Sequence, residues 1–314
     1  MRPYKWRRYV PGRVVAVSIA ILAGAWPGGA QNRFVPEGPF FRSDSTLVLV
    51  PTTVVDRSGA TVNGLTGEAF TLTEDGVRQQ VRSFSEEDAP VSMGIVLDLS
   101  GSMKGSLPTA KESLQALLSE ANPDDEAFLN AVSTRPRALS GFTRDFAELL
   151  DRGAGEGAAG DTALIDTIYE SLKQLHSSVH ARKALLVISD GMDNHSRHSR
   201  DELMELAVES DAQIYTIAAS SPPAYAKAIE LTEQKRGLLF LDELAAKTGG
   251  FGMVVRDGAE IAKAAARIGR ALRNQYIIGY APRPDNRYGQ WHRIRVKVAG
   301  SGLRAYARAG YRLD

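Results

Sequence analysis

The chain has 314 residues, of which 43% are hydrophobic and 24% are charged, a composition typical of a folded protein with one large domain or two smaller ones. Its 38 basic and 37 acidic residues give a formal net charge of +1, which argues against a nucleic-acid-binding chain and against an acidic disordered one. The absence of cysteine excludes disulfides, thiolate metal sites and a cysteine nucleophile.

The first 30 residues have the layout of a secretory signal peptide. Five basic residues lie in the first 13 positions, and no acidic residue occurs before Glu37. The apolar run at 14–25 is shorter than the roughly 20 residues that a membrane-spanning helix needs, and small residues suit cleavage after Ala30. We therefore expect an extracytoplasmic protein, periplasmic or secreted, which contacts a membrane only through this segment if the segment stays uncleaved.

A small β-unit is expected next. Residues 31–45 are polar and rich in proline and glycine, which predicts an exposed leader. The residues at 46–55, 69–73 and 77–84 are typical of strands, and turn residues separate them. We expect an antiparallel β-unit at 46–90, which is too small to be stable unless it packs against the rest of the chain.

From residue 91, apolar runs alternate with amphipathic helical patterns, which predicts a doubly wound, mostly parallel α/β sheet with helices on both faces. The continuous apolar run at 93–97 is typical of a central strand covered on both faces. Further strands are expected at 127–132, 184–188, 213–218 and 252–255, and helices at 107–121, 164–175, 202–209, 242–247 and 261–272. Together they predict one α/β domain at 91–274.

The chain then returns to β structure. Residues 275–280 are strand-like, and at 293–298 apolar residues alternate with basic ones, so one face of this strand would be buried and the other charged. We expect a C-terminal β segment at 275–314 that packs with the N-terminal β-unit. Its basic face could bind an anionic polymer, although a solvated sheet face is the more ordinary interpretation.

Ligands of an open parallel sheet bind beyond the carboxyl ends of its strands, so the residues after each apolar run are the candidates for chemistry. Two of these runs end in acidic and hydroxyl-bearing residues, and a glycine-rich loop between them leads to a threonine at a predicted helix start. The residues in question are Asp98, Ser100, Ser102, Thr162 and Asp190. Three hydroxyls and two carboxylates form an all-oxygen set, which suits a hard cation such as Mg²⁺.

This set in this order resembles the metal-ion-dependent adhesion site of the von Willebrand factor type A (VWA) domain. Other motifs, such as those at 54–59, 188–194 and 272–280, resemble a family of bacterial exported proteins called VWFA-related. The second resemblance covers roughly residues 46 to 314.

The resemblance implies a role for each residue of the set. Ser100, Ser102 and Thr162 would contact the metal directly, while Asp98 and Asp190 would act mostly through bound water and by orienting the hydroxyls. A cation held mainly by neutral hydroxyls keeps much of its positive charge, so it can accept a carboxylate from a partner. The partner would be a protein that presents an acidic side chain to the metal.

We therefore expect a non-enzymatic protein that binds Mg²⁺, with Mn²⁺ or Ca²⁺ as substitutes, and that mediates metal-dependent adhesion or protein–protein interaction. No nucleotide is expected, because no Gly-x-Gly-x-x-Gly turn follows the first predicted strand of the α/β domain and no Walker A lysine loop occurs. Two alternatives stay open. The same cation could serve a hydrolase, with His195 or His198 as the base. The protein could also be a structural scaffold whose site is idle.

Several polar residues near this set have ordinary interpretations. His195 and His198 lie in a polar loop without an evident third ligand and are interpreted as solvated histidines. Asp193 is interpreted as a loop residue, and the acidic run at 124–126 as a separator between a helix and a strand. Asp161 stands where a small residue would be expected before the threonine of the set.

Overall fold

A computed structural model of the protein describes residues 47–103, 107–154, 160–219, 228–255, 258–283, 286 and 289–313. The expected signal peptide at 1–30 and leader at 31–45 lie outside these residues, and of Ser102 only the backbone is described. None of the helices in the described ranges is both long enough and apolar enough to cross a lipid bilayer.

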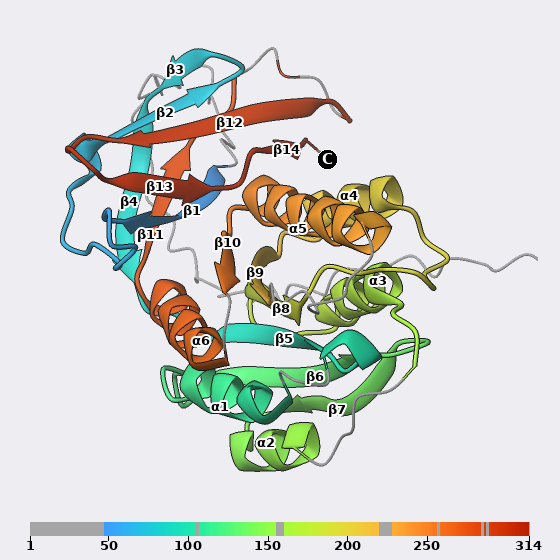
Figure 1. Ribbon diagram of the computed structural model, residues 1–314. Coiled ribbons are helices and arrows are strands. Elements are labelled where there is room, and N and C mark those ends of the chain that lie inside the picture. The colour runs from blue at the N-terminus through green and yellow to red at the C-terminus, as the bar shows by residue number, and fades with distance from the viewer. Residues whose placement is uncertain are drawn as a thin grey trace, which may run out of the picture. The chain divides into compact units, whose positions relative to one another are not determined.

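The middle of the chain forms a six-stranded sheet of five parallel strands and one antiparallel edge strand, in the order β10-β9-β8-β5-β6-β7 (Figure 1). Its strands are β5 (Val91–Asp98), β6 (Glu126–Val132), β7 (Arg137–Thr143), β8 (Arg182–Ser189), β9 (Gln213–Ala219) and β10 (Gly252–Val255). Every residue of β5, β6 and β9 is buried, as expected of strands covered on both faces. The predicted doubly wound α/β fold is confirmed.

Helices cover both faces of this sheet (Figure 1). They are α1 (Leu107–Leu118), α2 (Phe146–Ala154), α3 (Leu164–Leu175), α4 (Arg200–Glu209), α5 (Ala228–Thr248) and α6 (Gly258–Arg273), with short 3₁₀ turns η1 (Gly67–Ala69) and η2 (Gly101–Met103). Neighbouring residues of a strand point to opposite faces, so Ile95 packs in the core under α1 and α6, and Val96 in the core under α3, α4 and α5. The sheet therefore separates two apolar cores.

The remaining strands form two four-stranded antiparallel sheets, and each sheet combines strands from both ends of the described chain. The strand orders are β13-β1-β11-β4 and β14-β12-β2-β3. Their bounds are β1 (Val48–Val55), β2 (Phe70–Glu74), β3 (Val77–Gln79), β4 (Val81–Glu87), β11 (Gln275–Tyr280), β12 (Trp291–Val298), β13 (Arg304–Ala307) and β14 (Gly310–Arg312). One apolar core includes Val50, Phe70, Tyr276 and Ile294, so both sheets and both segments share it.

Four of the differences from the sequence-based expectation concern the strand at 77–84, the strand β7 and the helices α2 and α5. The strand predicted at 77–84 is two strands, β3 and β4, which separate at Gln80 and join different sheets. The edge strand β7 and the helix α2 were not predicted; most of β7 is at least partly exposed, so its sequence lacks the apolar run of a central strand. Helix α5 begins at Ala228 instead of residue 242, because exposed Leu231 and Leu239 obscure its amphipathic pattern.

The acidic run at 124–126 does more than separate a helix from a strand, which corrects that interpretation. Asp125 is 0% exposed and forms an ion pair of 3.1 Å with Nη2 of Arg273, at the end of α6. The same carboxylate accepts hydrogen bonds from the backbone N–H groups of Val91 at 2.7 Å and Asn122 at 2.9 Å. Asp125 therefore joins the start of β5 to the end of α6.

Candidate metal site at the carboxyl edge of the central sheet

Asp98 and Asp190 lie at the carboxyl ends of two neighbouring parallel strands. Asp98 is the last residue of β5, Asp190 directly follows β8, and the register pairs Leu97 with Ile188 just before them. Asp98 is 1% exposed and Asp190 is 6% exposed. The parallel register therefore brings two carboxylates together at a place that is almost closed to water.

The carboxylate of Asp98 is held by two hydrogen bonds. The backbone N–H of Ser100 donates to Oδ1 at 2.9 Å, and the hydroxyl of Ser189 donates to Oδ2 at 2.6 Å. Burial, and then the nearby charge of Asp190, raise the pKa of Asp98 to about 6, although the hydrogen bonds from Ser100 and Ser189 act in the opposite direction. Two acidic groups therefore repel each other in an environment of low polarity.

Three loops that carry the predicted set are tied to one another in pairs. The strands that lead into two of these loops, β5 and β8, are joined at their ends by the bond from Ser189 to Asp98. The loop after β5 also joins the segment before α3, since the N–H of Gly101 donates to the carbonyl of Gly160 at 3.4 Å. That segment joins the loop after β8, because the N–H of Asn194 donates to the carbonyl of Thr162 at 3.0 Å. A closed ring of hydrogen bonds therefore joins the three segments that carry the set.

The hydroxyl-bearing residues of the set occupy two of these loops. Ser100 is buried directly after β5, and the backbone of Ser102 lies in η2. Thr162 is buried two residues before α3; its N–H donates to Oδ1 of Asn194 at 2.8 Å, and its carbonyl accepts from the N–H groups of Asn194 and His195. These contacts fix the backbone of Thr162 and make no use of its hydroxyl.

The donor set fits a hard cation only if hydroxyls take part. Within the ranges that the structure describes, no group of three or more histidine, aspartate or glutamate side chains is placed to hold a metal ion. Asp98 and Asp190 supply two carboxylates, and the buried residues Ser100 and Thr162 supply neutral hydroxyl oxygens in the segments joined to them. A cation here would offset the repulsion between the two buried carboxylates, which no ion pair among the described residues does.

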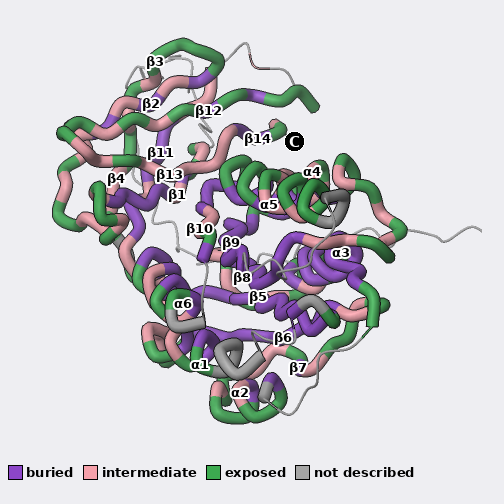
Figure 2. Tube along the Cα trace, in the orientation of Figure 1, coloured by how far each residue is buried: buried purple, intermediate pink, exposed green. Residues whose placement is uncertain are grey.

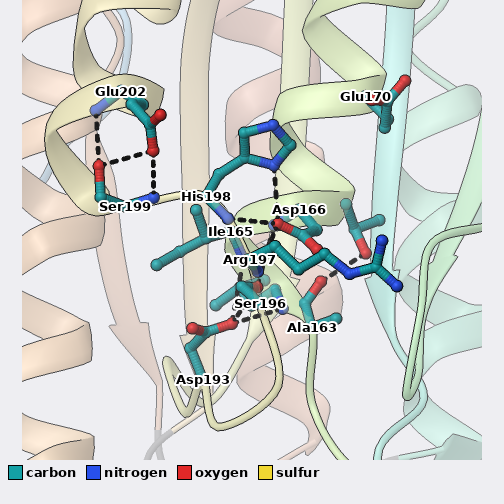
Figure 3. Close-up of polar contacts among 12 residues, drawn as sticks. Ala163, Ile165, Asp166, Glu170, Asp193, Ser196, Arg197, His198, Ser199 and Glu202 are labelled. Atoms are coloured by element: carbon teal, nitrogen blue, oxygen red, sulfur yellow. Dashed lines mark hydrogen bonds and ion pairs between the residues drawn. The ribbon is translucent and has the colours of Figure 1, made fainter.

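The loop after β8 also caps α3, as Figure 3 shows. The N–H groups of Leu164 and Ile165 donate to Oδ1 of Asp193 at 2.8 and 3.2 Å, and that of Asp166 donates to the hydroxyl of Ser196 at 3.0 Å. These are the first-turn N–H groups that have no partner inside the helix. Asp193 is therefore the loop residue that the sequence predicts, and it also caps α3.

Asp166 of α3 in turn accepts hydrogen bonds from the loop after β8. Its Oδ1 accepts from the backbone N–H groups of Arg197 at 3.0 Å and His198 at 2.9 Å, and it lies 2.8 Å from Nδ1 of the His198 imidazole (Figure 3). Partial burial raises the pKa of Asp166, but the hydrogen bonds from His198 and Arg197 outweigh it and hold the pKa below its usual value. The loop and the helix therefore bind each other reciprocally.

The two histidines of this loop differ. The ring of His198 stacks on Tyr169 with centroids 3.9 Å apart, so His198 is a packed residue and its interpretation as a solvated histidine was wrong. The side chain of His195 is half exposed, and its Nδ1 lies 3.7 Å from Oδ2 of the exposed Asp161. Asp161 thus points to the loop histidine at the surface.

Sequence reasoning missed two residues that shape the site. Ser189 holds Asp98, and its signal was available, because it is the first hydroxyl after the apolar run at 184–188 and directly precedes Asp190. Asn194 holds the backbone of Thr162 from both sides, and nothing in its spacing from Thr162 indicates this contact.

Comparison with known families identifies the central part of the chain. Residues 93–192 match the family model of the von Willebrand factor type A domain. The matched segment begins in β5, ends two residues after Asp190 and includes all five residues of the predicted set. The chain therefore contains a VWA domain. The finer resemblance to exported VWFA-related proteins rests on motifs outside and inside this segment and stays a prediction, as do the domain limits at 91 and 274.

Several solved structures are similar to parts of the chain. The von Willebrand factor type A protein from Catenulispora acidiphila is 13% identical, with a TM-score of 0.48, over 88% of this chain and 75% of that chain. The vWF domain of the type V pili tip protein Mfa5 from Porphyromonas gingivalis is 14% identical, with a TM-score of 0.46, over 59% and 95%. The conserved hypothetical protein BatB from Bacteroides thetaiotaomicron is 16% identical, with a TM-score of 0.45, over 58% and 98%. No curated protein matches the chain.

Proposed function

We propose that the protein is an exported, non-enzymatic binding protein whose VWA domain holds a divalent cation and uses it to bind an acidic side chain of a partner protein. The cation would be Mg²⁺, with Mn²⁺ or Ca²⁺ as substitutes. The residues that would hold it are Asp98, Ser100, Ser102, Thr162 and Asp190. The observation that carries the proposal is the buried pair Asp98 and Asp190, whose carboxylates repel each other at the ends of neighbouring strands.

The balance of charges supports a binding role for the cation. When bound, the ion supplies a positive charge. The two buried carboxylates would act on it mostly through bound water and by orienting the hydroxyl groups. Ser100 and Thr162 are neutral, so they donate oxygen atoms without cancelling that charge. The residues of this chain therefore position the ion and leave it able to attract a carboxylate from another protein.

The hydrolase alternative needs a base that is free to take a proton. Nδ1 of His198 faces Asp166 and its ring stacks on Tyr169, an arrangement that orients the imidazole and leaves Nε2 able to take a proton. His195 is half exposed and is the second candidate from the sequence. No described contact joins either histidine to Asp98 or Asp190, so we propose the binding function instead.

The proposal of export rests on the sequence of residues 1–30, with the charged start, apolar run and small residues of a signal peptide. After cleavage, the mature protein would be periplasmic or secreted and would lose five basic and no acidic residues. The test is the N-terminal sequence of the protein recovered from the medium or the periplasm. Recovery of an intact chain from the cytoplasm would contradict it.

Thermal unfolding with and without metal tests the site. A cation at 100 times its dissociation constant should stabilise the fold by about 2.7 kcal/mol over the protein in EDTA, a shift of several degrees. Thr162→Val removes one hydroxyl and should abolish most of this shift, while Thr71→Val, the same change on β2, should leave it intact. The absence of a shift in the wild type, or an undiminished shift in Thr162→Val, would contradict the proposed site.

Binding of acidic peptides tests the use of the site. Synthetic peptides with one glutamate, immobilised on a sensor surface, should retain the protein with Mg²⁺ and release it in EDTA. The same peptides with glutamine in place of glutamate should retain little protein under either condition. A metal-induced thermal shift without any such retention would support the idle scaffold.

A further inference from the structure

One face of β12 presents a row of basic side chains and one tryptophan. Trp291, Arg293, Arg295 and Lys297 are exposed, whereas the alternate residues are buried or half-buried, which gives the banded pattern of β12 in Figure 2. Trp291 is 39% exposed, which is unusual for so large an apolar side chain. The outer face of this strand is therefore cationic along its whole length, with an aromatic ring at one end.

Neighbouring strands extend this face. The register places Thr73 of β2 opposite Arg295 and Thr71 opposite Lys297, and Thr73 in turn lies opposite Arg78 of β3. Opposite residues of an antiparallel pair point to the same side, so two threonine hydroxyls lie between the cations of β12 and Arg78. We call Arg78, Arg293, Arg295 and Lys297 the cationic strip.

The strip carries charge that the protein itself does not neutralise. In the described part of the chain, none of its four side chains lies within ion-pair distance of a carboxylate. Asp75, the acidic residue that lines the same face, is already engaged, since it lies 2.9 Å from Nδ1 of His292 and accepts the backbone N–H of Arg293 at 2.8 Å. The four cationic side chains therefore repel one another, and an anionic ligand would reduce this repulsion.

The strip borders a groove of about 620 Å³, which is large enough for several sugar units or amino acids. The residues that line it are Thr73, Asp75, Gly76, Trp291, Arg293, Arg295 and Lys297. The lining thus combines cations, a threonine hydroxyl and one aromatic face with the carboxylate of Asp75, which His292 and the backbone of Arg293 engage. A linear ligand lying along β12 would meet each of these in turn.

The chemistry of this lining distinguishes between classes of polyanion. A protein partner needs an apolar centre in its interface, and Trp291 is the only apolar side chain lining the groove among the described residues. A single-stranded nucleic acid binds by stacking successive bases on several aromatic rings, and the groove offers one. A polysaccharide with carboxylate groups uses all three features: its hydroxyls suit threonine, its carboxylates suit arginine and lysine, and a sugar ring can lie on the indole.

We propose that the cationic strip binds an acidic polysaccharide, with carboxylates paired to Arg293, Arg295 and Lys297 and one sugar ring stacked on Trp291. This interaction is independent of the cation proposed for the VWA domain, because no residue of the strip belongs to that site. It therefore goes beyond the metal-dependent binding of a protein partner, and it would persist in EDTA.

The test uses an oligogalacturonate of about ten sugar units as the probe and a neutral dextran of the same length as its control, both in EDTA. The protein should bind the oligogalacturonate and not the dextran, and binding should weaken as salt is raised, because the screening length falls from about 8 Å to 3 Å between physiological salt and 1 M. Arg295→Glu combined with Lys297→Glu should weaken binding about tenfold or more. Lys235→Glu combined with Lys263→Glu, the same charge change on exposed sites of α5 and α6, should leave it nearly unchanged.

Trp291→Ala tests the aromatic contact, and should weaken binding several-fold without changing its dependence on salt. Unchanged melting temperatures of the variants would show that their folds are intact. Equal weakening by both charge-reversed pairs would overturn the strip as the site. Equally tight binding of poly-glutamate or of a single-stranded oligonucleotide would overturn the polysaccharide as its ligand. Loss of oligogalacturonate binding together with an intact metal-induced thermal shift would overturn this proposal alone.

Discussion

Gly237 of α5 lies against Gly191, the residue that follows Asp190, so closely that a Cβ atom on Gly237 would overlap the backbone carbonyl of Gly191. Gly191 has a φ of 80°, in the left-handed region that favours glycine, and a Cβ atom on it would in turn crowd the backbone of Gly237. Two bare backbones therefore meet directly beside the candidate metal site.

Gly237→Ala should disturb the site although the residue is no part of the predicted set. The added methyl group would push α5 and the loop after Asp190 apart, at a cost of about 1–3 kcal/mol in unfolding free energy. It should also weaken Mg²⁺ affinity, measured by titration while following thermal unfolding. Gly141→Ala is the matched control, because a Cβ atom there meets no neighbour within 4 Å. Unchanged metal affinity in Gly237→Ala would show that this packing does not position Asp190.

The raised pKa of Asp98 predicts a pH dependence of stability in EDTA. Its pKa is about 6 in the fold against an ordinary 3.8, so the folded state binds the proton more tightly than the unfolded state. The favourable contribution is complete below about pH 4 and is lost as pH rises through 6, with a magnitude of about 3 kcal/mol. Urea unfolding between pH 4 and 7.5 measures it.

Asp98→Asn isolates this contribution, because asparagine does not titrate. In EDTA, the variant should gain stability relative to the wild type as pH rises from 4 to 7. In Mg²⁺ the order should reverse near neutral pH, since the ionised carboxylate of the wild type then has a cation to orient. A difference between wild type and variant that stays constant with pH would contradict the raised pKa.

Much of the fold could be predicted from the sequence, because parallel strands buried on both faces are continuous runs of apolar residues. The apolar runs at 93–97 and 184–188 correspond to β5 and β8, and the rule that ligands bind at strand ends led to Asp98 and Asp190, which the structure places together. The family match then identifies the VWA domain.

The missed features depend on contacts between distant residues. Residues 77–84 contain no glycine, proline, asparagine or aspartate, so no turn residue reveals that the chain changes sheets at Gln80. Asp193 and His198 look like loop residues until α3 lies beside them and supplies its first-turn N–H groups and Asp166. Asp125 likewise has an ordinary turn composition around it, and its partner Arg273 is far along the chain.

The hydrogen bond from Thr162 to Asn194 predicts a second effect on the metal site. Asn194→Ala removes the side chain that accepts from the N–H of Thr162, so it should lower the unfolding free energy by about 1 kcal/mol and weaken Mg²⁺ affinity. Ser199→Ala removes the capping box of the next helix, α4, and should cost a similar amount of stability without changing the affinity. Equal metal affinity in both variants would limit Asn194 to a structural role.

The buried pair Asp125 and Arg273 predicts a large effect on stability alone. Asp125→Ala leaves a largely buried guanidinium without this partner and two backbone N–H groups without an acceptor, so it should cost about 3–5 kcal/mol. Asp88→Ala removes the exposed carboxylate that pairs with the same arginine at 3.0 Å and should cost less than about 1 kcal/mol. Chemical denaturation of both variants tests the contrast, and similar losses would mean that burial does not decide the strength of these pairs.

The interleaved strands have a consequence for the order in which the chain can fold. Thr52 of β1 pairs with Tyr276 of β11 on one side and with Ala307 of β13 on the other, so both edges of β1 wait for residues that are synthesised much later. At about 5–20 residues per second, translation needs about 10–50 s to proceed from the first of these residues to the last. During this interval β1 exposes two unpaired edges, which invite pairing with other nascent chains. The pairing of β13 with β1 thus covers the last unpaired edge of β1 and removes this route to aggregation.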